Sequence, residues 1–104
     1  MANKETVNFP MSTTQVATVQ ITCINKPDRN SSHESITHLG NSQGKWTKEQ
    51  VIAWIDAKQF SFYTQDRFGT AWIGVVREAG KRPYLRTHAD GRWTDNLLAL
   101  PECP

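Results

Sequence analysis

The chain has 104 residues, with 12 basic and 10 acidic side chains and a formal net charge of +2. This length predicts one domain, and the near balance of charge speaks against a strongly basic nucleic-acid binder. Since no apolar run approaches the ~20 residues of a membrane span and the polar start lacks a signal peptide's apolar centre, we expect a soluble protein of the cytoplasm with no membrane contact.

Residues 1–15 are rich in Asn, Thr and Ser and show no periodicity, which predicts a flexible N-terminal tail before a single domain over residues 16–104. Apolar and polar side chains alternate from Val16 to Ile24, as in a half-buried strand. Pro27 and the Asp and Asn residues beside it then favour a turn. Residues 36–39 predict a short second strand.

A helix is the clearest local prediction. After a loop over residues 40–44, Thr47 stands at an N-cap position and Gln50 follows three residues later, which is the pattern of a capping box. Apolar side chains then recur at helical spacing. The sequence therefore predicts a helix from about Lys48 to Lys58.

Three more strands are predicted in the second half of the chain. Residues 60–64 alternate in polarity, residues 70–77 are strongly apolar, and residues 82–88 follow as the partner strand of a hairpin. The dipeptide Asp90-Gly91 is typical of a tight turn. The tail over residues 97–100 holds three leucines, which we expect to pack back on the core.

The predicted order of elements is β-β-α-β-β-β. Strands joined mostly by hairpins, with one helix among them, indicate an α+β fold. We therefore expect a small antiparallel sheet of about five strands, covered on one face by a single helix.

Several segments together resemble a known family. They are Ile21-Thr22-Cys23-Ile24-Asn25-Lys26, Ile36-Thr37-His38-Leu39, Trp46 with the capped helix, Tyr84-Leu85-Arg86-Thr87, Asp90-Gly91 and Asp95-Asn96-Leu97-Leu98-Ala99-Leu100-Pro101. Over about Val19 to Cys103 the chain resembles domain-of-unknown-function family 3892, a group of small bacterial proteins. The resemblance implies no activity, cofactor or catalytic residue.

The two cysteines allow two interpretations. Cys23 lies on the inward side of the first predicted strand, and Cys103 follows the tail that packs on the core. In a reducing compartment we expect two free thiols, one buried and one near the surface. A disulfide that closes a long loop is the alternative. No catalytic motif surrounds either cysteine, so we assign neither as a nucleophile.

The remaining candidate ligands and acids favour structural roles. His33 and His38 have the spacing of one zinc-ligand pair, but no cysteine pair accompanies them, so ordinary histidines are preferred over a zinc site that also includes His88. Asp90 suits a turn, and Asp95 suits the capping of backbone groups in the tail. We therefore expect no metal, no cofactor and no catalytic residue.

Basic and aromatic side chains gather in the second half. Six basic residues stand between Arg67 and Arg92 against two acidic ones, with Trp72 and other aromatic residues among them. In the predicted strand over residues 82–88, Tyr84 and Arg86 share one face. The candidate binding residues are Arg77, Arg82, Tyr84, Arg86, Arg92 and Trp93.

Two functions remain open. We expect a small non-enzymatic interaction module that binds a protein partner, as an adaptor or inhibitor, through a sheet edge or the Arg and aromatic face. The alternative is nucleic-acid binding by the second half, in which aromatic rings stack on bases and Arg side chains contact phosphates.

Overall fold

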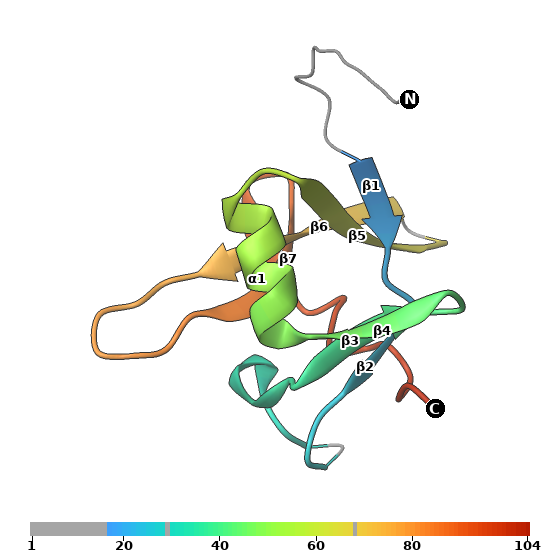
Figure 1. Ribbon diagram of the computed structural model, residues 1–104, viewed down its shortest axis with the longest axis horizontal. Coiled ribbons are helices and arrows are strands. Elements are labelled where there is room, and N and C mark those ends of the chain that lie inside the picture. Colours follow the sequence, from blue (N-terminus) through green and yellow to red (C-terminus); the bar gives the residue numbers. More distant parts are fainter. Residues whose placement is uncertain (1–16, 29, 68) are drawn as a thin grey trace, which may run out of the picture.

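Two sheets and one α-helix make up the computed structural model, which describes residues 17–28, 30–67 and 69–104 (Figure 1). The predicted tail over residues 1–15 lies outside these residues. The larger sheet has the order β1-β5-β6-β7-β8, formed by Ala17–Gln20, Phe60–Asp66, Gly69–Val76, Tyr84–Ala89 and Arg92–Thr94. The smaller sheet has the order β2-β3-β4, formed by Cys23–Asn25, His38–Asn41 and Gly44–Thr47. The helix α1 spans Lys48–Asp56, and the short 3-10 helix η1 spans His33–Ser35.

The fold is mostly sheet with one helix, but the prediction of one antiparallel sheet was wrong. The first predicted strand divides into β1 and β2, which belong to different sheets. The backbone N–H of Ile21 still donates to Tyr63 O in the larger sheet at 2.8 Å, whereas that of Thr22 donates to Gly40 O in the smaller sheet at 2.9 Å. The chain therefore crosses between sheets at these two residues. A local alternation of polarity cannot reveal this crossing, because it indicates faces and not strand partners.

The pairing of β1 with β5 is parallel, which also corrects the antiparallel prediction. Parallel strands need a long crossover connection. Here that connection contains the whole smaller sheet and α1, which together separate β1 from β5 in the chain. The remaining ladders of the larger sheet are antiparallel.

Two short strands, β4 and β8, lie where the sequence predicted a loop or the tail. β3 and β4 form a tight hairpin in which Asn41 pairs with Gly44, and the Asn41 side chain accepts a hydrogen bond from the Gln43 backbone at 2.8 Å. β8 follows the predicted turn directly. Asp90 and Gly91 have φ angles of 54° and 78°, which confirms the tight turn, because positive φ at both central residues is typical of two-residue hairpins whose turn matches the right-handed twist of the strands.

The helix begins as predicted. Thr47 Oγ1 accepts from the Gln50 backbone at 3.1 Å, and the Gln50 side chain accepts from the Thr47 backbone at 3.0 Å, so the capping box is confirmed. The helix ends at Asp56, two residues before the predicted Lys58. Lys58 has a φ of 58°, and this left-handed conformation terminates the helix.

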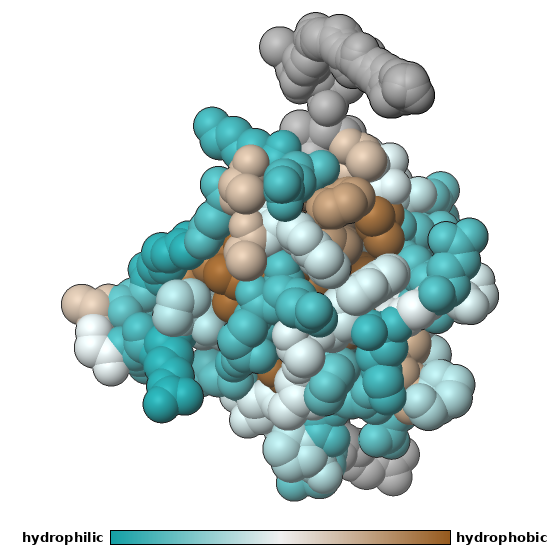
Figure 2. Space-filling view, in the orientation of Figure 1, coloured by the Kyte–Doolittle hydropathy of each residue, from teal (hydrophilic) through white to brown (hydrophobic). Residues whose placement is uncertain are grey.

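The core lies between α1 and both sheets. Its buried members are Ile21, Ile24, Ile36, Leu39, Val51, Phe62, Ile73, Leu85 and Leu97. α1 thus covers the face of β5, β6 and β7 that carries Phe62, Ile73 and Leu85, which we call the inner face (Figure 1). Seen from the helix side, the surface is mainly hydrophilic, with apolar side chains gathered beside β1 and β5 (Figure 2). The expected packing of the leucine tail is confirmed, since Leu97 is completely buried.

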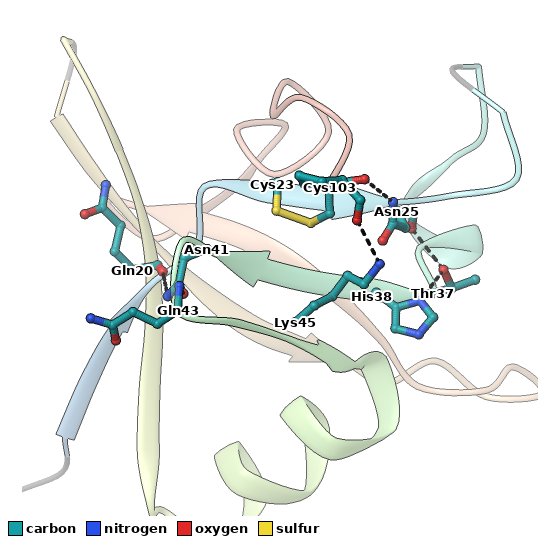
Figure 3. The surroundings of a disulfide bond; sticks show 10 residues. Gln20, Cys23, Asn25, Thr37, His38, Asn41, Gln43, Lys45 and Cys103 are labelled. Atoms are coloured by element: carbon teal, nitrogen blue, oxygen red, sulfur yellow. Dashed lines mark hydrogen bonds between the residues drawn. A yellow bond between two sulfur atoms is a disulfide. The ribbon is translucent and has the colours of Figure 1, made fainter.

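The expectation of two free thiols was wrong, because Cys23 and Cys103 form a disulfide (Figure 3). Their Cα atoms lie 4.9 Å apart, within the range that a disulfide requires. The tail reaches this position along β2, where the Ile24 N–H donates to Pro101 O and the Cys103 N–H donates to Ile24 O, both at 3.0 Å. The tail therefore extends the smaller sheet beyond β2.

Candidate functional site

The candidate site lies on the outer face of the larger sheet, opposite the inner face that α1 covers. Side chains alternate between the two faces of a strand. On β6, Ala71 and Ile73 are buried, whereas Trp72 between them is 41% exposed. On β7, Leu85 and Thr87 are buried, and Tyr84, Arg86 and His88 point the other way. The outer face thus carries large aromatic and polar side chains that the core does not use.

The strand register places four of these rings in one row. Tyr63 of β5 pairs with Trp72 of β6, Trp72 pairs with His88 of β7, and His88 pairs with Trp93 of β8. Directly opposed residues of neighbouring strands lie close enough for their side chains to interact. We call Tyr63, Trp72, His88 and Trp93 the aromatic row.

The rings of the row form two pairs. The centroids of Tyr63 and Trp72 lie 5.5 Å apart with their planes inclined by 56°. Those of His88 and Trp93 lie 5.6 Å apart with their planes almost perpendicular, at 85°. Trp72 and Trp93 are 41% and 47% exposed and are the large hydrophobic side chains most open to solvent in the described chain. Water therefore meets apolar ring surface on this face.

Gly74 makes room for the second pair. It lies two residues after Trp72 on the outer side of β6, and a Cβ atom there would stand 3.1 Å from His88 Cδ2 and 3.3 Å from Trp93 Cη2. Such distances are shorter than ordinary carbon contacts. The absence of a side chain at Gly74 thus lets the His88 and Trp93 rings lie against the β6 backbone.

A hollow opens beside the row where β5 and β6 part. The ladder between these strands stops at the Tyr63–Trp72 pair, although both strands continue beyond it. The hollow has a volume of about 310 Å³. Trp72 and His88 stand at its margins with Ser61 and Lys58, and its floor is apolar, formed by Ile55, Phe60 and Ile73.

A smaller set of residues extends the site at the other end of the row. His88, Gly91, Arg92 and Trp93 line a second shallow hollow of about 300 Å³. Each hollow carries one cationic side chain, Lys58 in the first and Arg92 in the second, and no carboxylate lines either of them. His88 borders both, so the two hollows flank the row's second ring pair.

Three of the predicted binding residues share the outer face. Trp93 belongs to the row itself. Arg86 donates from Nε to Thr94 O at 3.1 Å and from Nη2 to Asp95 Oδ1 at 2.9 Å. The Tyr84 hydroxyl donates to Glu78 Oε1 at 3.4 Å.

The other three predicted residues lie apart from one another. Arg77 directly follows β6 and forms an ion pair with Asp56 at the end of α1. Arg82 is exposed in the loop between β6 and β7. Arg92 opens β8 and borders the second hollow. The six predicted residues therefore do not form one continuous basic surface.

Carboxylates offset much of the positive charge of the second half. Besides the pairs of Arg77 and Arg86, Lys81 Nζ lies 3.3 Å from Glu34 and 3.6 Å from Glu78. In the part of the chain that the structure describes, Arg82 and Arg92 form no such pair. These exposed ion pairs add little stability, but each one lowers the charge available to a phosphate group.

One buried histidine lies next to the outer face. His33 is 7% exposed, and its Nε2 is 3.9 Å from Asp95 Oδ1, too far for a hydrogen bond. Burial lowers the pKa of His33, the Arg86 guanidinium lowers it further, and Asp95 acts in the opposite direction. His33 is therefore neutral in the folded protein at neutral pH.

The candidate binding residues inferred from the sequence did not include three members of the row, Tyr63, Trp72 and His88, although Trp72 was noted among the aromatic residues of the second half. The alternation of polarity indicates that each faces away from the core, since buried residues flank Tyr63 and Trp72 on both sides. The alternation does not reveal the register of the four strands. Only this register shows that the rings lie in one row.

Other site types find no support among the described residues. No group of three or more His, Cys, Asp or Glu side chains is arranged to hold a metal ion in residues 17–28, 30–67 and 69–104. Within the same ranges, no helix has the length and apolar character that crossing a membrane requires.

The comparisons with known proteins point to a family. The family model described as "Protein of unknown function (DUF3892)" matches residues 20–101, which include every element from β2 to β8. Neither the curated proteins nor the solved structures include a match to this chain. The match covers most of the chain, including the whole aromatic row, and on this ground the chain belongs to the DUF3892 family.

Proposed function

We propose that this protein is a small non-enzymatic interaction module, of adaptor or inhibitor type, that binds a protein partner through the aromatic row. The observation that carries the proposal is the register that aligns Tyr63, Trp72, His88 and Trp93 on the uncovered face of the larger sheet. Exposed Trp and Tyr side chains are the residues that most often anchor protein interfaces. The apolar floor of the neighbouring hollow offers such an interface a place for a partner side chain.

Nucleic-acid binding is the second candidate, and the aromatic rings together with Lys58 and Arg92 favour it. Single-stranded nucleic acid binds where rings stack on bases and cations contact phosphates. Two features weigh against it. The rings of each pair are strongly inclined to one another. In addition, Arg77, Lys81 and Arg86 are already paired with carboxylates.

Site-specific photocrosslinking in the native host tests the proposal. A photoreactive residue replaces Gln65, which is exposed on the outer face two residues from Tyr63, and in a matched control it replaces Glu49 on α1. We expect one discrete protein adduct from position 65 and none from position 49. Added purified wild-type protein should compete for that adduct, and the Trp93→Ala variant should not.

The crosslinking result also separates the two candidates. An adduct that disappears after nuclease treatment, together with salt-sensitive binding of labelled oligonucleotides, would establish the nucleic-acid alternative. Equal adducts from positions 65 and 49, or none from either position, would contradict binding through the row.

The cytoplasmic location expected from the sequence stays a prediction, and the Cys23–Cys103 disulfide bears against it. Disulfides persist in oxidising compartments and are rare in the cytoplasm. Alkylation of thiols in intact host cells, followed by reduction and a second label, measures the state of both cysteines. Thiols labelled in the first step would support the cytoplasm, and thiols labelled only after reduction would exclude it.

A further inference from the structure

We propose that the Cys23–Cys103 disulfide is a redox switch, which holds residues 101–104 on β2 and releases them when a dithiol reduces it. We call these residues the end segment. The inference goes beyond the proposed function, because it concerns the smaller sheet and not the aromatic row. Four features carry it: the few other contacts of the end segment, an unsatisfied polar atom beneath it, the firm anchor that precedes it and the position of the disulfide.

The end segment has little apolar surface with which to stay bound. Cys103 is buried, whereas Pro101, Glu102 and Pro104 are all exposed. On β2 the backbone contacts are those of Ile24, whose N–H donates to Pro101 O and whose carbonyl oxygen accepts from the Cys103 N–H, both at 3.0 Å. Such hydrogen bonds add little net stability, because water can replace them, and fixing each residue costs conformational entropy. Without the disulfide, the end segment is therefore only weakly held.

The side chain of Asn25 is only partly satisfied when the end segment is in place. Its Nδ2 donates to Cys103 O at 3.2 Å, but its Oδ1 is buried and accepts no hydrogen bond from a described residue. A buried acceptor without a donor costs free energy. The unsatisfied atom thus offsets part of what the bond to Cys103 contributes.

Leu97 limits how far a release can extend along the tail. Its side chain is completely buried in the core, and its N–H donates to Thr87 Oγ1 at 3.3 Å. Neither contact depends on the disulfide. The chain up to Leu97 therefore stays in place when the disulfide opens, and the release is confined to the end of the tail.

The disulfide lies on the face of the smaller sheet that points away from the core. Ile24 and Leu39 belong to the core, and side chains alternate along a strand, so Cys23 and its register partner Gly40 face the opposite way. A Cβ atom on Gly40 would stand 3.3 Å from Cys103 Sγ, so the disulfide rests against the bare backbone of Gly40. Both chain neighbours of Cys103 are exposed, and a reductant can approach from this side.

The reaction needs a dithiol from outside the protein. One thiolate of the dithiol attacks Cys103 Sγ, the bond between the two cysteines breaks, and Cys23 leaves as a thiolate with the bonding electron pair. The second thiolate of the dithiol then attacks the reductant's own sulfur in the mixed disulfide and displaces Cys103. The dithiol is oxidised to a disulfide, and its two electrons and two protons end on the protein as two thiols.

Release changes the surface of the smaller sheet in two ways. The N–H and carbonyl groups of Ile24 lose their partners, which leaves this edge of β2 open to pairing with another strand. In addition, Pro101 and Glu102 line a hollow of about 320 Å³ together with Ile24 and Pro27, and this wall of the hollow is lost. The redox state therefore determines the shape of one edge of the molecule.

Nuclear magnetic resonance relaxation on the full-length, 15N-labelled protein tests the proposal, before and after excess dithiothreitol is added without denaturant. On reduction we expect the backbone order parameters of Glu102 and Cys103 to fall from about 0.85, typical of rigid backbone, to below about 0.6. Those of Leu85 and Leu97 should not change, which distinguishes local release from unfolding. Oxidised glutathione should restore the original values.

Two variants separate the disulfide from the hydrogen bonds. Cys103→Ser in oxidising buffer should show the mobile end segment of the reduced wild type and should not respond to dithiothreitol. Lys45→Ala is the matched control, because it removes the hydrogen bond from Lys45 Nζ to Pro104 O at 3.2 Å and keeps the disulfide. Its end segment should stay rigid until dithiothreitol is added.

Three results would overturn the proposal. They are a disulfide that dithiothreitol does not reduce in the folded protein, an end segment that stays rigid after reduction, and a loss of order at Leu85 and Leu97 together with the end segment. The reduced wild type is measured directly, so the outcome does not depend on whether Cys103→Ser folds. It is also separate from crosslinking at position 65, which tests the aromatic row.

Discussion

At the scale of single residues, Thr87 holds together three segments of the fold. It is completely buried on β7 and accepts a hydrogen bond from the Thr94 hydroxyl at 2.8 Å. Its own hydroxyl donates to Thr94 O at 3.2 Å and accepts from the Leu97 backbone N–H at 3.3 Å. One side chain therefore joins β7 to β8 and to the start of the tail.

Replacing Thr87 with valine should destabilise the protein by about 1–3 kcal/mol. Valine has nearly the same shape, but the Leu97 N–H and the Thr94 hydroxyl lose their buried acceptor. The measurement is the free energy of unfolding in urea. Thr70→Val, at an exposed position of β6, is the control and should stay within about 0.5 kcal/mol of the wild type. An equal effect of both substitutions would contradict this role of Thr87.

His33 predicts a pH dependence of stability. Because burial lowers the pKa of His33 below its ordinary 6.5, the unfolded chain binds more protons than the folded protein as the pH falls below that value. The contribution of neutral His33 to stability is complete above pH 6.5 and is lost progressively until the lower pKa of the folded state is reached. We expect lower urea midpoints at about pH 5.5 than at about pH 7.5, and a flatter profile for His33→Gln. Identical profiles would refute the assignment to His33.

At the scale of secondary-structure elements, the entry of α1 can be tested directly. Thr47→Ala removes the side chain that accepts from the Gln50 backbone and should cost about 1 kcal/mol. The measurement is the midpoint of chemical denaturation. Glu49→Ala, in the same turn but outside the capping box, serves as the control. An unchanged midpoint for Thr47→Ala would show that the box does not contribute.

The elements predicted correctly depend on local signals. The capping box needs only Thr47 and Gln50, and the tight turn needs only Asp90 and Gly91. The opposite faces of Tyr84 and Leu85 follow from strand alternation alone. Such signals span a few residues, so the sequence displays them completely.

The elements predicted wrongly depend on long-range pairing. The crossing at Ile21 is decided by whether Tyr63 or Gly40 accepts the next backbone hydrogen bond, and these residues are far apart in the chain. β4 follows a very short turn, and the glycines at residues 40 and 44 made this segment look like a loop in the sequence. The aromatic row was missed for the same reason, because four registers must be known before Trp72 and Trp93 can be placed together.

At the scale of the whole molecule, the C-terminal tail joins the two sheets. Leu97 belongs to the core beneath the larger sheet, whereas Pro101 and Cys103 bond to β2 of the smaller one. Asn25 Nδ2 donates to Cys103 O at 3.2 Å, and Lys45 Nζ donates to Pro104 O at 3.2 Å (Figure 3). The last residues of the chain are therefore part of the fold.

Deleting residues 97–104 should give an aggregated or unfolded product. The deletion removes buried Leu97 and exposes its apolar neighbours in the core, and it also removes the bonds along β2. Size-exclusion chromatography and urea unfolding measure the outcome. Removal of residues 1–15 is the comparison and should leave cooperative unfolding intact. A soluble truncation that unfolds cooperatively without the tail would disprove the prediction.

The disulfide should stabilise the fold by about 2–4 kcal/mol, because it links residues separated by 80 positions and so restricts the unfolded chain. The double variant Cys23→Ser with Cys103→Ser should unfold at a correspondingly lower urea concentration. Reducing agent should lower the midpoint of the wild type and leave that of the double variant unchanged. Equal midpoints for the oxidised wild type and the double variant would show that the bond contributes nothing.

The bond between Cys23 and Cys103 also turns nearly the whole chain into a covalent ring, from which β1 extends as a branch. A protease that cuts once in the exposed loop between β6 and β7 opens this ring without releasing a fragment. The segment with β7 and β8 then remains attached to the rest through sulfur, beside the strands with which it pairs. Such a nicked molecule keeps every strand of the aromatic row at high local concentration, and it separates into two pieces only when it is both cut and reduced.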